Sequence, residues 1–422
     1  MGATNGLTDT FAGKPHPHRH TMYPLNRRSA LQLIATGLAA PSIAGAQAGP
    51  SWTAVEARAR GQTVYFNAWG GSARVNAYLQ WAAGEVSRMY AVTVEHVKLT
   101  DTVEAVKRVR SEKAAGRLSD GTVDVVWING ENFLTMKREG LLYGPFAESL
   151  PSYAGVDIQG KPTTRVDFSE PVDGMEAPWG MAQFTLFADA TRVPAPPRNM
   201  AALAEFARTN PGRVTYPRPP DFTGATFLKQ ALVELNPDRG ALYRPVTPET
   251  FARATAPLWA WLDALHPHLW RSGRQFPASP AAIRQMVADG ELFVGLTFNP
   301  NEPANEVAAR RLPPATTSWQ FSAGALANTH FLAIPFNARA REGALVLINF
   351  LLSPQAQARK DDIAVWGDPT VLAVDRLPPA ERARFSTARK PGQVAQTAPA
   401  IPEPHGSWVE PLEREWLRRY GT

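Results

Sequence analysis

Polar and aromatic side chains gather in two loops that each follow a short apolar run in the first third of the chain. The loops contribute Trp69, Gly70 and Ser72 in one case and Asn129, Glu131 and Asn132 in the other. Glycine lets backbone N–H groups approach a ligand, while an aromatic face, amides and a carboxylate can bind a polar or cationic group. The same residues could form turns and cap the helices that follow, so the pattern leaves ligand binding and helix capping open.

Similar groups recur in two loops further along the chain. Asp221 and Thr223 precede a helical pattern, and Asn299 and Glu302 follow an apolar strand pattern. Their side chains and the neighbouring backbone donors could contact a ligand. Helix capping and turn formation are equally consistent with these four residues.

Three more candidates lie in segments that should connect two folded regions. Trp179 and Gln183 belong to the apolar stretch 177–187, and Asn328 leads into a later strand pattern. The Trp179 ring could form one wall of a ligand cleft, or it could pack in a hinge. Both interpretations predict that these residues lie near the place where the chain passes from one region to the other.

The candidate loops are acidic and aromatic. They contain Asp101, Glu131, Asp221 and Glu302 but no Lys or Arg, and they are flanked by Trp69, Trp127 and Trp179. Such a site suits a cation or a polar neutral molecule, since each cation–π contact contributes about 0.5–2 kcal/mol. An anion stays open, because helix N-termini bind anions through backbone donors alone.

Several classes of chemistry are excluded or disfavoured by the residue types. The chain has no Cys, which excludes disulfides, thiolate metal sites, cysteine nucleophiles and a lipid-modified N-terminal cysteine. It also lacks HExxH, GxxxxGK[ST], a GxGxxG after a strand and a Ser-centred elbow. His266 and His268 have no clear third ligand, so we expect no metal and no cofactor. A binding protein is therefore favoured, with a secreted carbohydrate- or phosphate-active enzyme as the alternative.

The composition is that of a folded globular protein. The 422 residues are 44% hydrophobic and 19% charged, and a chain of this length is expected to form two lobes rather than one core. The net charge is +6, and half of it lies in the first 48 residues, which contain four basic residues against Asp9. The remaining charge is too small to indicate a nucleic-acid-binding surface.

Residues 26–48 have the layout of an export signal. Arg27 and Arg28 precede an apolar run at 31–46, and small residues follow it. The run is too short and too broken to span a membrane as a helix. The paired arginines resemble the twin-arginine signal, but Sec export stays open because the flanking residues depart from that motif.

This layout predicts how the chain is processed. Translation should start at Met22, and cleavage should follow Ala46 or Ala48. No later stretch has 18 uninterrupted apolar residues. We therefore expect a soluble, exported protein in the periplasm.

The apolar pattern behind the candidate loops alternates between strands and helices. Strand patterns lie at 64–69, 92–97 and 123–128, and helical patterns follow at 75–90, 102–115 and 132–142. Three strand–helix units in tandem predict a parallel α/β sheet, and open sheets of this kind bind ligands at the carboxyl ends of their strands. A second α/β region covers 200–322, with strands expected at 214–216 and 292–298 and helices at 200–209, 226–235, 248–265 and 280–289. A strand at 329–335 then returns towards the first region.

One segment carries a family resemblance. Residues 349–357 read NFLLSPQAQ and follow a strand that ends at Ile334 and Pro335. This phrase resembles the late helix of solute-binding proteins of ABC importers. Larger blocks resemble the YnjB-like branch of that superfamily, and they lie at 65–72, 96–102, 127–132, 176–183, 258–270 and 366–370. Together these blocks span nearly the whole mature chain.

The resemblance implies an α/β, two-lobe periplasmic-binding-protein fold of type II, with a mixed, mostly parallel sheet flanked by helices in each lobe. The returning strand places lobe 1 at 49–186 plus 326–375, and lobe 2 at 187–325 plus 376–422. The implied function is an extracytoplasmic receptor that closes around a small polar or cationic solute and delivers it to the membrane permease of an ABC importer. We expect a monomer without a nucleic-acid partner. The resemblance does not identify the ligand.

Overall fold

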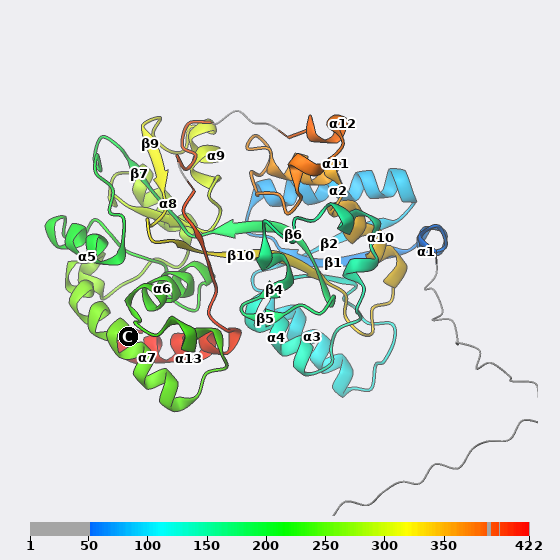
Figure 1. Ribbon diagram of the computed structural model, residues 1–422, viewed down its shortest axis with the longest axis horizontal. Helices are drawn as coiled ribbons and strands as arrows, with labels where there is room; N and C mark the ends of the chain where they lie inside the picture. The colour runs from blue at the N-terminus through cyan, green and yellow to red at the C-terminus, as the bar shows by residue number, and fades with distance from the viewer. Residues whose placement is uncertain (1–50, 386–389, 396, 422) are drawn as a thin grey trace, which may run out of the picture. The chain divides into compact units, whose positions relative to one another are not determined.

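Two sheets and a short hairpin organise the residues that the computed structural model describes, which are 51–385, 390–395 and 397–421 (Figure 1). The expected export signal at 1–48 lies outside these described residues. Within them, no helix combines the length and the apolar character that a membrane span requires.

The larger sheet has six strands in the order β11, β10, β3, β1 and β2, with β6 also paired to β10. Their bounds are β1 (Thr63–Trp69), β2 (Thr93–Leu99), β3 (Val125–Ile128), β6 (Glu176–Gln183), β10 (Ala325–Ala333) and β11 (Ala400–Pro402). β1 is parallel to β2 and β3, whereas β10 is antiparallel to β3 and β6. The tandem strand–helix units therefore form the expected mixed sheet, and β10 is the predicted returning strand.

Helices cover both faces of this sheet. Val64 and Phe66 point into a large core, while Val126 and Ile128 point into a smaller one, because successive side chains of a strand alternate between faces. The helices of the first lobe are α1 (Trp52–Ala59), α2 (Ala73–Tyr90), α3 (Val103–Ala114), α4 (Gly130–Arg138), α10 (Arg341–Leu351), α11 (Pro354–Asp361) and α12 (Pro379–Arg382). With both faces covered, the carboxyl ends of β1, β2 and β3 are the open edge of the sheet.

The second lobe is built on a smaller sheet, whose strands are β7 (Thr185–Asp189), β8 (Gly295–Thr297) and β9 (Thr316–Trp319). Its helices are α5 (Met200–Thr209), α6 (Phe222–Leu235), α7 (Pro248–Leu265), α8 (Pro280–Ala288), α9 (Glu302–Ala308) and α13 (Val409–Tyr420). β7 is antiparallel to both of its neighbours, so the mostly parallel sheet expected in each lobe describes the larger sheet only. The reason is that β7 continues directly from β6, while β8 and β9 run back against it.

One expected strand does not form. Residues 214–216 are buried, but they pair with no other strand. The carbonyl of Val214 instead accepts a hydrogen bond from the backbone N–H of Trp270, at 2.9 Å. This contact satisfies a buried backbone group without a ladder, which a sequence pattern does not distinguish from a strand.

Several helix bounds follow from capping residues. Thr247 forms a capping box with Thr250 at the start of α7, and Pro248 occupies the first turn. Asn199 and Ser353 accept hydrogen bonds from backbone N–H groups at the starts of α5 and α11. These signals explain why α5 and α7 have the bounds that the sequence predicts.

The chain passes between the lobes three times. β6 continues into β7, β10 returns, and β11 lies beside β10 in a later crossing. Phe385 still packs in the core of the first lobe, whereas the carbonyl of Gly392 accepts a hydrogen bond from Ser318 of the second lobe at 2.7 Å. The predicted lobe limits are therefore best revised at their last boundary, and we propose that the tail changes lobe after Phe385 rather than at residue 376.

A short hairpin of the first lobe contacts this tail. It consists of β4 (Val166–Asp167) and β5 (Glu170–Pro171), joined by Phe168 and Ser169, whose φ angles are 41° and 63°. Positive φ is unusual for residues other than glycine and persists where surrounding contacts fix it. Here Ser169 Oγ donates to the carbonyl of Glu403 at 2.8 Å, and the N–H of Gly406 donates to the carbonyl of Phe168 at 3.1 Å.

Candidate functional site

The loop after β1 leaves an indole ring open to solvent. Trp69 is 43% exposed, and a Cβ atom on Gly71 would lie 2.4 Å from its ring, so glycine is what lets the ring fold over the loop. The N–H of Gly70 donates to the carbonyl of Leu99 at 3.0 Å, and Ser72 Oγ accepts from the first turn of α2. Gly70 and Ser72 thus have turn and capping roles, and Trp69 is the group that remains open.

The loop after β3 brings a carboxylate towards the second lobe. Asn129 precedes α4 without capping it through its side chain, and Gly130 has a φ of 63°. The N–H of Gly130 donates to Asp167 Oδ2 of the hairpin at 2.7 Å. Asn132 Nδ2 donates to Glu131 Oε1 at 3.3 Å, and Glu131 is only partly buried. The first turn of α4 lies next to the hairpin, and the hairpin contacts the tail. Glu131, in that turn, therefore lies close to the tail.

The corresponding loop of the second lobe caps α6. Asp221 accepts hydrogen bonds from the N–H groups of Thr223 and Gly224 at 2.9 and 3.1 Å, and Thr223 is buried. Burial raises the pKa of Asp221, and these two backbone donors lower it. Between them, Phe222 is 40% exposed and meets the edge of the Phe298 ring at 5.3 Å. The Phe222 ring lies next to the cap and was not among the candidates that the sequence indicated.

The side chains of Asn299 and Glu302 form hydrogen bonds and an ion pair within the second lobe. Asn299 Oδ1 accepts from the N–H of Asn301 at 2.9 Å, which closes a turn. Glu302 pairs with Arg284 and also accepts from Thr297. The same turn reaches the first lobe, because Asn301 Nδ2 donates to the carbonyl of Gly367 at 2.8 Å.

The candidates on the crossing strands are buried. Gln183 Nε2 donates to the carbonyls of Ala325 and Ala398 at 3.4 and 3.1 Å, which ties together the crossing segments. Asn328 Nδ2 donates to Glu403 Oε1 at 3.4 Å, while its Oδ1 has no hydrogen-bond partner. Gln183 therefore braces the crossings, and Asn328 faces a buried carboxylate of the tail.

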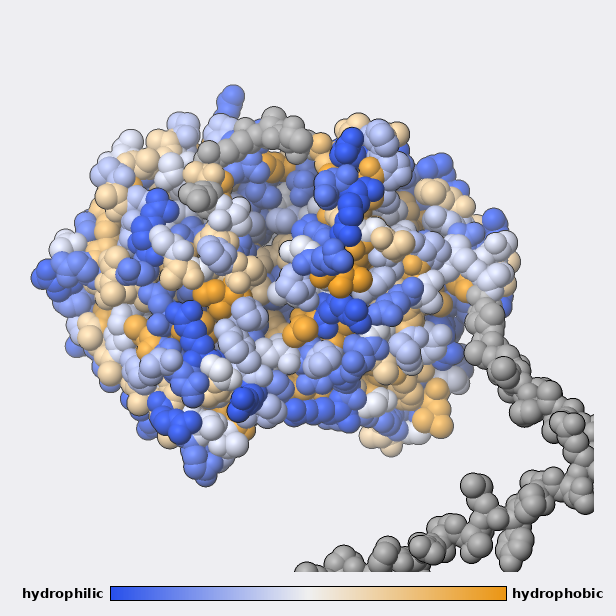
Figure 2. Space-filling view, in the orientation of Figure 1, coloured by the Kyte–Doolittle hydropathy of each residue, from blue (hydrophilic) through white to orange (hydrophobic). Residues whose placement is uncertain are grey.

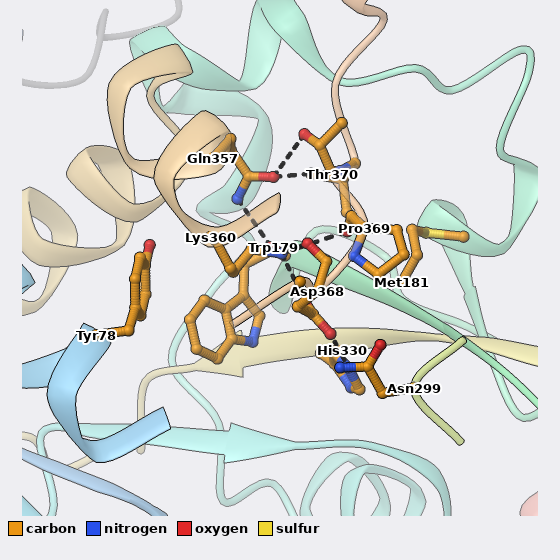
Figure 3. A network of polar contacts seen from close by, with 12 residues as sticks. Tyr78, Trp179, Met181, Asn299, His330, Gln357, Lys360, Asp368, Pro369 and Thr370 are labelled. Carbon is orange, nitrogen blue, oxygen red and sulfur yellow. Dashed lines mark hydrogen bonds and ion pairs between the residues drawn. The ribbon is translucent and has the colours of Figure 1, made fainter. Parts of the chain in front are cut away.

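Trp179 lies in the core of the first lobe rather than on a cleft wall (Figure 3). Its ring is fully buried and meets the rings of Trp127 and Trp366 at 5.1 and 5.5 Å. The next residue must be glycine, since a Cβ on Gly180 would lie 2.1 Å from the carboxylate of Asp368. Packing in the core of the first lobe is the role that the structure supports for Trp179.

Carboxylates of both lobes gather around one lysine, and we call this group the interlobe cluster. It comprises Asp101, Glu131 and Asp167 of the first lobe, and Lys229, Glu403 and Glu413 of the second lobe and tail. Lys229 Nζ lies 2.9 Å from Glu403 Oε2, and both side chains are 1% exposed. Asp167 Oδ1 has no hydrogen-bond partner among the described residues.

The pKa values in the interlobe cluster are shifted towards the neutral acids. Burial raises the pKa of Glu131, and the carboxylates of Asp101 and Glu403 add to the rise, while Lys229 opposes it. Burial, with Glu131 and Asp101 as further causes, raises the pKa of Glu413 to about 8. The pKa of Asp167 is likewise raised well above its ordinary value, mainly by burial. Burial and the repulsion among these carboxylates thus outweigh the attraction of the one lysine and favour the neutral acids.

The surface between the lobes is hollowed in the view of Figure 2, where hydrophobic and hydrophilic residues meet. Phe222 and Trp69 are among the few large apolar side chains with more than a third of their surface exposed. Exposed aromatic rings beside uncompensated carboxylates can bind a cation through both ring faces and charge. No group of three or more His, Asp or Glu in the described part of the chain has an arrangement that could hold a metal ion.

Five members of this site were not among the candidates that the sequence indicated. They are Asp167, Phe222, Lys229, Glu403 and Glu413. One signal was present: Lys229 is the single charged residue between residues 222 and 233, and a lone lysine in an apolar helix needs a buried partner. No local signal identifies that partner as Glu403, which is far away in sequence.

Comparison with known sequences gives a family. Residues 75–374 match the model of the family described as bacterial extracellular solute-binding protein. The chain is 49% identical over 371 residues to protein YnjB of Escherichia coli strain K12, covering 88% of this chain and 94% of that protein.

Comparison with solved structures supports the fold. The PotD substrate-binding protein of a spermidine/putrescine transporter from Streptococcus pneumoniae has a TM-score of 0.58 at 12% identity, over 85% of this chain and 98% of that chain. AfuA from Actinobacillus pleuropneumoniae, with fructose-6-phosphate bound, has a TM-score of 0.58 at 13% identity, over 86% and 99%. The chain belongs to the bacterial extracellular solute-binding protein family and is a solute-binding receptor, as its resemblance to the receptors of ABC importers implied.

Proposed function

We propose that this receptor binds a small cationic solute between its lobes, closes on it, and delivers it chemically unchanged to the membrane permease of an ABC importer. The observation that carries the proposal is the interlobe cluster, in which Lys229 pairs with Glu403 and is the only cation among five interacting carboxyl groups. The ligand's positive charge would complete this cluster.

The balance of charge favours a cation over an anion. The Lys229–Glu403 ion pair is internally neutral, and the other four carboxyl groups have no matching cation in the cluster; these are Asp101, Glu131, Asp167 and Glu413. An added anion would have to overcome these groups, whereas an added cation lowers the free energy of their ionised forms. A sugar phosphate, as in AfuA, would need compensating basic side chains, and the cluster contains one lysine that is already paired.

Closure follows from the origin of the cluster in both lobes. Glu131 stands on α4 of the first lobe, and Glu413 stands on α13 of the second. A ligand shifts an open–closed equilibrium only by its difference in affinity for the two states, so contacts from both lobes are what closure requires. A cation between these carboxylates provides that difference.

The proposal includes where the receptor works. Export of the chain, removal of residues up to Ala46 or Ala48, and action as a periplasmic monomer fit the signal-like layout of 26–48 and the extracellular location of the family. N-terminal sequencing of the exported protein should begin at residue 47 or 49. Changing Arg27 and Arg28 to Lys should block export if the twin-arginine route is used, and should leave it unimpaired if Sec is used.

The experiment that tests the function starts from the ligand that co-purifies. The receptor is isolated from the periplasm, its bound small molecule is identified by native mass spectrometry, and the ligand is removed and titrated back. We expect a small molecule with at least one positive charge, and a decrease in the radius of gyration by small-angle scattering when it binds. A bound anion, or binding without compaction, would overturn the proposal.

A further inference from the structure

Lys229 is a fully buried ammonium in an otherwise apolar stretch of α6. Its side chain is 1% exposed, and the residues that flank it in the helix are buried as well. Burying an ammonium without partners is strongly unfavourable, so the groups that surround it must provide the compensation. The identity of those groups shows what kind of site the lysine occupies.

Three groups face the Lys229 ammonium. Glu403 Oε2 lies 2.9 Å from Nζ, and the centroids of the Phe168 and Phe222 rings lie 4.2 and 5.4 Å away. A carboxylate combined with aromatic ring faces is the arrangement by which proteins recognise ammonium ligands. Phe168 belongs to the hairpin of the first lobe, whereas Lys229 and Phe222 belong to α6 of the second.

The groups around the ammonium are held by contacts that do not involve Lys229. A Cβ on Gly130 would lie 2.8 Å from the Phe168 ring, so the start of α4 packs directly against that ring. The backbone of Glu403 is fixed by Ser169 Oγ at 2.8 Å, and its carboxylate accepts from Asn328 Nδ2 at 3.4 Å. The ring and the carboxylate would therefore keep their positions if the lysine side chain were shortened.

We infer that Phe168, Phe222 and Glu403 form an ammonium subsite that the protein fills with its own Lys229, and that this internal ligand holds α6 of the second lobe against the hairpin of the first. The inference rests on the proposed function only in taking the space between the lobes as the binding site. Opening the lobes must withdraw the Lys229 ammonium from the Phe168 ring. The external solute then binds beside this subsite, at Glu131 and Glu413.

Chemical rescue tests the subsite. Lys229→Ala deletes three carbons and the ammonium, which together have the size of n-propylammonium. We expect n-propylammonium chloride to raise the unfolding temperature of Lys229→Ala saturably, and to compact it by small-angle scattering. Sodium chloride at the same ionic strength and 1-propanol, which is neutral and of similar size, should do neither. The wild-type receptor freed of ligand should not respond, because its subsite is full.

Two further variants keep the test decisive. Lys229→Met fills the space without charge, so n-propylammonium should not stabilise it. The double variant Lys229→Ala/Phe168→Leu lacks the closest ring, so its response should be several-fold weaker. If Lys229→Ala does not fold by itself, the same comparison is made on its refolding yield in each additive.

The outcomes separate this inference from the proposed function. Rescue that is no stronger than with sodium chloride, or equally strong with 1-propanol, would overturn the ammonium subsite. That result would leave the proposed function standing if Glu131→Gln still weakened binding of the co-purified solute. Rescue by n-propylammonium together with an anionic natural ligand would support the subsite and refute the proposed solute class.

Discussion

Two buried lysines, Lys360 and Lys229, make a natural comparison. Each is almost fully buried, each pairs with a buried carboxylate, and each lies near two aromatic rings. They differ in how completely their surroundings satisfy the charges. That difference separates a structural network from a candidate binding site.

The Lys360 ammonium has an acceptor for each of its three N–H groups (Figure 3). Its Nζ donates to Asp368 Oδ2 at 2.6 Å and to the carbonyls of Asp368 and Pro369 at 3.2 and 3.3 Å. The other oxygen of Asp368 lies 3.1 Å from His330 Nε2. Burial alone would raise the pKa of Asp368, but Lys360 and His330 outweigh it and hold the pKa below its ordinary value. The network braces β10 against the loop after α11.

The surroundings of Lys229 are incomplete. Its partner Glu403 has a raised pKa, because burial outweighs the attraction of the lysine. Nearby, Asp167 Oδ1 and Asn328 Oδ1 have no hydrogen-bond partners within the described residues. Buried polar groups are normally satisfied, and we propose that these two oxygens are satisfied when a ligand binds. Four predictions test this contrast, from the largest expected effect to the smallest.

Removing the Lys360 charge should cause the largest loss of stability. Lys360→Met leaves Asp368 buried without its main cation, and breaking one partner of a buried pair lowers the free energy of unfolding by about 3–5 kcal/mol. Urea denaturation followed by circular dichroism measures this loss. Arg414→Gln, which breaks an exposed pair with Glu410, is the control and should change stability by less than about 1 kcal/mol. Equal effects of the two substitutions would refute the structural assignment.

Removing carboxylates of the interlobe cluster should weaken ligand binding rather than folding. Glu131→Gln and Glu413→Gln should each reduce affinity roughly ten- to a hundredfold, or about 1.5–3 kcal/mol, because each removes a charge-assisted contact. Calorimetric titration of the co-purified solute measures the change. Glu205→Gln, which alters an exposed ion pair with Arg208 on α5, should leave the affinity unchanged. Unchanged affinity in both cluster variants would show that Glu131 and Glu413 do not bind the solute and have structural roles only.

The two regions should respond to pH in opposite directions. The pKa of Glu413 is raised from 4.5 to about 8, so the stability that this group contributes to the ligand-free protein is present below its unfolded value and is lost as pH rises towards 8. The pKa of Asp368 is lowered, so its contribution is present above its unfolded value and is lost on acidification.

Denaturation of the ligand-free receptor across this pH range measures the first effect. Glu413→Gln should flatten the decline between weakly acidic and weakly alkaline pH, and Glu205→Gln should not, because the pKa of Glu205 is lowered by its hydrogen bond with Arg208. A decline of the same steepness in both variants would show that Glu413 does not titrate in this range.

The smallest effect is expected at the open indole ring. Trp69→Leu should weaken binding of a cationic solute by about 0.5–1 kcal/mol, a few-fold change, which is the size of an exposed cation–π contact. Leu118→Ala, which alters another exposed apolar side chain, is the control and should have no effect on affinity. If the Trp69 variant binds like the wild type, the solute does not reach the end of β1.

The sequence predicted those parts of the fold that local signals determine. α5 and α7 were predicted with their observed bounds, because an asparagine cap, a capping box and proline at the first turn mark them. The strand expected at 214–216 failed, because a short buried segment can satisfy its backbone through irregular contacts. The comparison with the family confirmed the receptor function that the NFLLSPQAQ segment had suggested.

The site was less predictable than the fold, because the residues that form it come from distant parts of the chain. Loop position indicated Glu131, but the same reasoning selected Glu302, which pairs with Arg284 within its own lobe. Trp179 is an aromatic residue of the kind expected in a cleft wall, but its ring packs in the core of the first lobe. Lys229 and Glu403 are 174 positions apart, so nothing local to either residue predicts their ion pair.

Proton exchange on binding tests most directly whether a cation completes the interlobe cluster. The co-purified solute is titrated into the ligand-free receptor near neutral pH by calorimetry, in two buffers that differ in ionisation enthalpy. A cation favours the ionised carboxylates, so we predict that the receptor releases protons and that Glu413→Gln reduces the number released. Binding with proton uptake, or with no exchange, would contradict the role of these carboxylates in holding a cationic solute.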